Sequence, residues 1–132
     1  MLMIIALKAF DSLGQEPGWN APPRAPLDIP LNVAGNFMEL RSDHFHSGVD
    51  LKTNGVEGLP VRAVAAGRVS RVKMSPWGYG IAVYIDHPGG LTSVYGHLQA
   101  LAPALASQVL EAQYKAQDYT VDLTPPDVNL QF

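Results

Sequence analysis

The chain has no cysteine, no cluster of basic residues and no long hydrophobic run, and each absence excludes a class of protein. Without cysteine there is neither a disulfide nor a thiolate ligand, so a metal site must use His and carboxylates. A formal net charge of −3 at pH 7, with no Lys/Arg cluster, argues against nucleic acid as a partner. No segment has the length of a transmembrane segment. At 132 residues, the chain is one domain or part of one.

The first thirty residues contain two unusual segments. Leu2–Leu7 resembles a shortened signal-peptide core without a basic n-region, and a signal remnant, a buried strand and a frayed terminus all remain possible. Residues 13–30 carry five prolines, which bias the preceding residues away from helix. We therefore divide the chain into an N-terminal extended arm over residues 1–25 and a domain over residues 26–132.

Twelve Gly and eleven Pro favour short strands joined by turns. We expect two short strands within residues 60–73, meeting at Ala66-Gly67, and a hairpin of residues 81–85 and 91–95 whose loop is residues 86–90. Shorter strands are expected at residues 31–34 and 119–123. This pattern predicts an all-β core built on an antiparallel sheet.

One helix interrupts the strand pattern. Leu101, Leu105 and Val109 lie four residues apart, and Pro103 stands near the expected first turn. We predict an amphipathic helix within residues 100–118, inserted outside the β core and contributing no metal ligand.

His46 and Asp50 are a nitrogen and an oxygen donor of the kind that zinc binds. In a straight strand their side chains would share a face at a separation of roughly 13 Å. Ligands of one zinc ion place their donor atoms within about 2.0–2.2 Å of the metal, so the backbone must bend between them, most easily at Ser47-Gly48. The spacing alone is weak, because an exposed loop His near a turn-capping Asp explains it equally well.

A wider set of motifs resembles the lysostaphin-type zinc endopeptidases that cleave peptidoglycan cross-bridges, over roughly residues 26–132. The match is closest to the envelope group with a helical insertion after Gly-His-Leu. The motifs are Phe37, Glu39-Leu-Arg41, His46-Ser-Gly-Val-Asp50, Pro60-Val-Arg-Ala63, Ala66-Gly67, Gly78-Tyr-Gly80 and Tyr95-Gly-His-Leu98.

The resemblance implies a lysostaphin-like peptidase fold with Zn2+ as cofactor, His46 and Asp50 as zinc ligands, and His97 as a catalytic acid/base. It also implies peptidoglycan peptides as the substrate and a cell-envelope location, periplasmic or extracellular. The family completes its site with a later His-x-His motif, which supplies the third ligand and the partner of the catalytic His. No histidine follows His97.

We therefore expect this chain to be an N-terminal portion of a catalytic domain whose C-terminal strands are missing, and to be inactive alone. The alternative is a non-catalytic cell-wall-binding or hydrolase-activating module of the same fold.

Several other residues have two interpretations each, and no substrate-binding residue can be assigned. His44 shares a face with His46 and is either a ligand or a hydrogen-bonded loop residue, and the latter fits better. His87 lies at the expected hairpin tip and is a weaker ligand candidate. Arg41 and Asp43 either contact substrate or cap the turn before His46. Trp77 and Tyr79 either line a peptide groove or pack beneath a loop.

Overall fold

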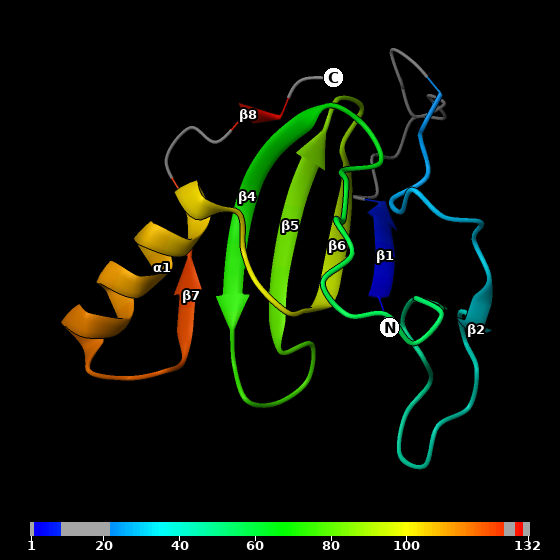
Figure 1. Ribbon diagram of the computed structural model, residues 1–132, viewed down its shortest axis with the longest axis horizontal. Helices are drawn as coiled ribbons and strands as arrows, with labels where there is room; N and C mark the ends of the chain where they lie inside the picture. Colours follow the sequence, from blue (N-terminus) through cyan, green and yellow to red (C-terminus); the bar gives the residue numbers. More distant parts are fainter. Residues whose placement is uncertain (1, 9–21, 126–128, 131–132) are drawn as a thin grey trace.

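One antiparallel sheet organises the chain in the computed structural model, which describes residues 2–8, 22–125 and 129–130. The strands follow the order β2-β3-β1-β6-β5-β4-β7, with β8 paired to β4 (Figure 1). One helix, α1 (Pro103–Ala116), connects β6 to β7. The strands are β1 (Leu2–Lys8), β2 (Val33–Gly35), β3 (Val49–Leu51), β4 (Gly67–Met74), β5 (Ile81–His87), β6 (Leu91–Leu98), β7 (Val121–Leu123) and β8 (Asn129–Leu130).

Strand β1 lies inside the sheet, between β3 and β6. Figure 1 shows it beside β6. Its residue Met3 is in register with Asp50 of β3 on one side and with Gly96 of β6 on the other. The N-terminal apolar segment is thus a strand, one of the alternatives that its sequence allowed. Residues 9–21, which include the first part of the proline-rich segment, lie outside the described residues.

The main core covers one face of the central strands. Val72, Val83 and Tyr95 are in register across β4, β5 and β6, and all three are buried. Leu105 and Val109 of α1 belong to the same cluster. The predicted helix is therefore confirmed: it begins with proline in its first turn and ends at Gln117, which has a left-handed backbone. The all-β core with one inserted helix is confirmed as well.

The prediction of two strands within residues 60–73 is wrong in its first half, because only Gly67–Met74 is a strand. The backbone before it forms other hydrogen bonds. Arg24 donates its N–H to the carbonyl of Val64, and Arg62 donates to the carbonyl of Pro26, at 2.8 and 2.9 Å. Val64 in turn donates to the Tyr95 hydroxyl at 2.8 Å. Residues 60–66 have the composition of a strand, but their backbone groups already have these hydrogen-bond partners. They therefore need no neighbouring strand to pair with.

The expected hairpin loop of residues 86–90 is shorter than predicted. His87 pairs with Leu91 at the end of β5, and its ring is buried. Its Nδ1 lies 2.9 Å from the carbonyl oxygen of Ala66, and its Nε2 lies 2.8 Å from the Ser93 hydroxyl, which contacts the Tyr95 hydroxyl at 3.0 Å. His87 is therefore a structural residue of the core.

Gly67 makes this arrangement possible. A Cβ at residue 67 would lie 2.5 Å from the Asp86 carbonyl oxygen and 2.8 Å from His87 Nδ1. We predict that Gly67→Ala lowers the free energy of unfolding by roughly 1–3 kcal/mol through overpacking. Urea denaturation followed by circular dichroism measures the change.

Gly55→Ala is the control, because that site has open space and a φ of 75°, so its cost is backbone strain alone. A smaller loss at Gly67 than at Gly55 would contradict the packing argument.

Candidate functional site

A small hairpin over residues 38–46 places His46 beside β3. Met38 donates its N–H to the His46 carbonyl, and His46 donates its N–H to the Glu39 carbonyl, both at 2.8 Å. An isolated bridge joins Leu40 to Phe45 within this hairpin. The backbone then bends at Gly48 before β3 begins at Val49, as the sequence predicted.

The bend brings the two predicted metal ligands together in a buried position. His46 Nε2 lies 3.3 Å from Asp50 Oδ1, and the two residues are 6% and 3% exposed. The predicted convergence of His46 and Asp50 is confirmed. Asp50 Oδ1 is buried and has no hydrogen-bond partner, although it faces a ring nitrogen.

The hydrogen-bond partner of His46 Nδ1 selects one tautomer of the neutral ring. His46 Nδ1 lies 2.9 Å from the carbonyl oxygen of Asn36, which can only accept, so Nδ1 carries the proton of the neutral ring. Nε2 then presents a lone pair to Asp50 Oδ1, itself an acceptor. Two acceptors that face each other in a buried position are electrostatically unfavourable unless a cation lies between them.

The other oxygen of Asp50 is held by Arg41. A guanidinium nitrogen of Arg41 lies 2.8 Å from Asp50 Oδ2 and 3.3 Å from a carboxylate oxygen of Glu39. Gly35 of β2 provides the space, since a Cβ there would lie 2.6 Å from both Arg41 and Asp50. Arg41 therefore orients the carboxylate of Asp50 so that only Oδ1 faces His46.

His97 lies two strands away from Asp50. Met3 is in register with both Asp50 and Gly96, so at a strand spacing of about 4.8 Å the backbones of Asp50 and Gly96 are roughly 10 Å apart. The side chain of His97, the next residue, is exposed. His97 also lines a cavity of about 1070 Å³ that extends over the core face; His46 and Asp50 do not line it.

Tyr79 links the two parts of the site. Its hydroxyl lies 2.8 Å from the Ser47 hydroxyl, next to His46, and its carbonyl accepts the N–H of His97 at 2.8 Å. Neither this link nor the carbonyl of Asn36 had been found from the sequence. Only the glycines on either side of Tyr79 pointed to an unusual backbone there.

The remaining candidates lie away from the His46–Asp50 pair or serve other contacts. His44 Nδ1 is 2.6 Å from Asp43 Oδ1 on the surface, and this hydrogen bond lowers the pKa of the Asp43 carboxyl. His44 is thus a hydrogen-bonded loop residue. The side chain of Trp77 is 82% exposed, so it does not pack beneath a loop.

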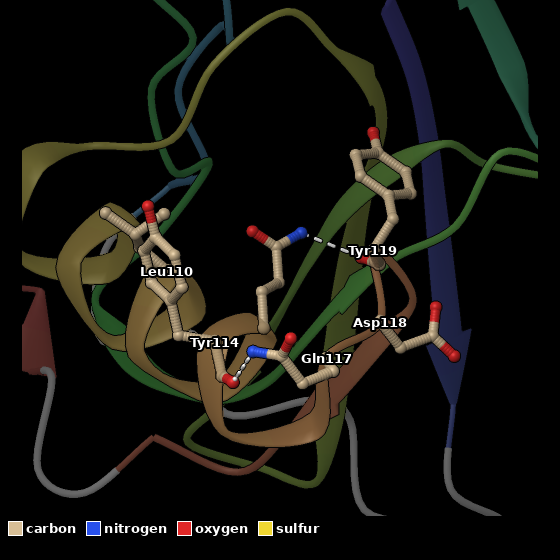
Figure 2. Close-up of a pocket in the computed structure, with 6 residues that line it drawn as sticks. Leu110, Tyr114, Gln117, Asp118 and Tyr119 are labelled. Carbon is tan, nitrogen blue, oxygen red and sulfur yellow. Dashed lines mark hydrogen bonds between the residues drawn. The ribbon is translucent and has the colours of Figure 1, made fainter.

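A second cavity, of about 320 Å³, lies at the C-terminal end of α1 (Figure 2). Tyr114 and Tyr119 flank it, and the Gln117 side chain donates to the carbonyl of Tyr114 at 2.7 Å. Asp118 is the only carboxylate among its lining residues, and no histidine lines it. This cavity therefore has no donor set for a metal.

Across residues 2–8, 22–125 and 129–130, no group of three or more His, Cys, Asp or Glu side chains is arranged to hold a metal ion. The His46–Asp50 pair is thus a two-donor site in this part of the chain. No helix among the described residues is both long and apolar enough to cross a membrane.

Comparison with known proteins gives one family. The sequence profile of peptidase family M23 matches residues 44–115, a segment that contains His46, Asp50 and His97. No curated protein and no solved structure matches the chain.

The Arg41–Asp50 pair gives a testable stability difference. We predict that Arg41→Met lowers the free energy of unfolding by about 2 kcal/mol, because it leaves the carboxylate of Asp50, whose side chain is 4% exposed, without its counter-ion. This value is smaller than for a fully buried pair because the Arg41 side chain is 37% exposed.

The matched control is Arg62→Met. Arg62 pairs with Asp28 at 2.6 Å, but both side chains are largely solvent-accessible, so the urea midpoint should change little. If Arg41→Met and Arg62→Met lowered the free energy of unfolding equally, the burial of Asp50 would not strengthen its ion pair with Arg41.

Proposed function

Because the chain belongs to peptidase family M23, we propose that it is part of a zinc-dependent endopeptidase that hydrolyses peptide cross-links of peptidoglycan. The observation that carries the metal proposal is the pair of buried acceptors, His46 Nε2 and Asp50 Oδ1, at 3.3 Å. Two ligands at about 2.0–2.1 Å from a tetrahedral zinc ion are about 3.3 Å apart. The pair therefore has the spacing of two zinc ligands.

Each residue around this pair has a defined task in the proposed site. His46 Nε2 and Asp50 Oδ1 would hold the ion, the carbonyl of Asn36 fixes the tautomer of His46, and Arg41 fixes the orientation of Asp50. Such outer partners orient metal ligands and raise their affinity for the ion. When bound, zinc polarises the scissile carbonyl and lowers the pKa of water.

His97 is the proposed acid/base. Its imidazole is exposed at the end of β6, where it can take a proton from an attacking water and return one to the leaving amine. Peptidoglycan as the substrate further implies a location in the cell envelope, periplasmic or extracellular. The alternative is a non-catalytic cell-wall-binding or hydrolase-activating module of the same fold.

We predict that the 132-residue chain binds zinc weakly and does not measurably cleave a cross-linked muropeptide. Catalytic zinc sites normally have three protein ligands and a water, and the described residues supply two. Competition with a chromogenic chelator measures affinity, and chromatography of the muropeptide measures cleavage. Stoichiometric zinc at micromolar protein would contradict the two-donor description.

A third donor added at the right register position should restore tight binding. Met3 stands opposite Asp50 on the neighbouring strand, and directly opposed residues of an antiparallel pair project from the same face with Cβ atoms about 4.5–5.5 Å apart. We predict that Met3→His raises the affinity for zinc by on the order of a hundredfold or more.

Ile4→His is the matched control, because residue 4 is one register position away from Asp50 and is in register with Val49 and Tyr95 instead. It should leave zinc affinity unchanged. If Met3→His bound zinc no better than Ile4→His, the proposed metal site at His46 and Asp50 would be wrong. Cleavage by a zinc-loaded Met3→His chain would favour the enzyme over the binding module.

A further inference from the structure

Tyr79 forms hydrogen bonds outside the strand pairing to both segments of the proposed site. Its side-chain hydroxyl lies 2.8 Å from the Ser47 hydroxyl, one residue after His46. Its backbone carbonyl accepts the N–H of His97 at 2.8 Å. Tyr79 thus connects two chain segments that β1 separates in the sheet.

The loop that carries Tyr79 is held in place on both sides. It joins β4 to β5, and Ser75 donates its N–H to the Gly80 carbonyl at 3.1 Å. Gly78 and Gly80 have φ values of 67° and 61°, a left-handed conformation that glycine adopts without cost. The Tyr79 side chain packs against the buried Val94 of β6, as does Tyr84. Tyr79 is therefore fixed by its backbone and by its ring.

His97 needs such support because its own backbone is strained. Its φ is 57°, a left-handed value that is costly for a residue other than glycine. The strain lies where the pairing of β5 with β6 shifts register, between Ile81 and Val83. A strained backbone persists only when its surroundings hold it, and the bond from His97 N–H to the Tyr79 carbonyl does so.

We propose that Tyr79 is a positioning residue that fixes the backbone of His97 relative to the turn bearing His46, through its hydroxyl on Ser47 and its carbonyl on His97. Loss of the hydroxyl bond releases one end of this link. The other end, at His97, then loosens even though nothing at His97 has changed. The proposal rests on the proposed function only for the chemical roles of His46 and His97.

Amide hydrogen exchange at His97 tests the link without metal or substrate. We expect Tyr79→Phe and Ser47→Ala each to speed exchange of the His97 amide by about tenfold, because each opens the same bond. Together they should have no greater effect than either alone, as expected for two partners of one interaction. Ser47 forms no hydrogen bond to His97, so its effect must pass through Tyr79.

Two further variants separate this effect from simple packing. Tyr84→Phe is the control, since Tyr84 packs on the same Val94 and its hydroxyl forms no hydrogen bond in the described structure. Its His97 exchange should match that of the wild type. Ser47→Thr keeps a hydroxyl and should restore protection. Unchanged His97 exchange in Ser47→Ala would overturn the proposal, whatever Tyr79→Phe does.

A second measurement links this role to the metal site. In the Met3→His chain, Tyr79→Phe should weaken zinc binding by about tenfold, because the turn that carries His46 loses a support. If Tyr79→Phe left the zinc affinity of the Met3→His chain unchanged, Tyr79 would position His97 but would not support the turn that carries His46. If Met3→His binds no zinc, the proposed metal site fails, whereas hydrogen exchange still decides on the Tyr79 link.

Discussion

The carboxylate of Asp50 imposes the main constraint on this region of the protein. A buried carboxylate must be paired, because an isolated charge in the interior is very costly. Arg41 pairs with one oxygen, and the other faces the unprotonated nitrogen of His46. The glycine at position 35 and the hairpin of residues 38–46 follow from this requirement, since one provides space for the ion pair and the other delivers both partners.

The segment that matches peptidase family M23 contains both His46 and Asp50, and among the described residues no third His, Asp or Glu side chain is arranged with them to hold a metal ion. The strand between the two parts of the site is β1, whose sequence from Leu2 to Lys8 contains no His, Asp or Glu. The sheet thus brings Asp50 and His97 to neighbouring positions across a strand that lacks the usual ligands of zinc. In the described sheet, the register position between Asp50 and Gly96 is occupied by Met3.

Sequence reasoning succeeded where one physical requirement dominated. The four-residue spacing of Leu101, Leu105 and Val109 predicted the helix, and the short distances of metal ligands predicted the bend before Asp50. The strand prediction was wrong where backbone N–H and C=O groups form hydrogen bonds with residues far away in the sequence. Residues 60–66 have a strand-like composition, but their hydrogen bonds go to the segment near Arg24 and to a tyrosine side chain. The contact of Tyr79 with Ser47 likewise depends on how separate loops meet over the sheet.

The central position of β1 also has a consequence for how the chain folds. β1 and its neighbour β6 are far apart in the sequence, with β2 to β5 between them, so their pairing closes a long loop. Such non-local pairing makes folding slow, because the entropy of closure is lost before the contacts form. The hairpin of β5 and β6 needs only a short turn and can form early. We therefore expect the strands that bear Asp50 and His97 to come together late in folding, when β1 pairs between them.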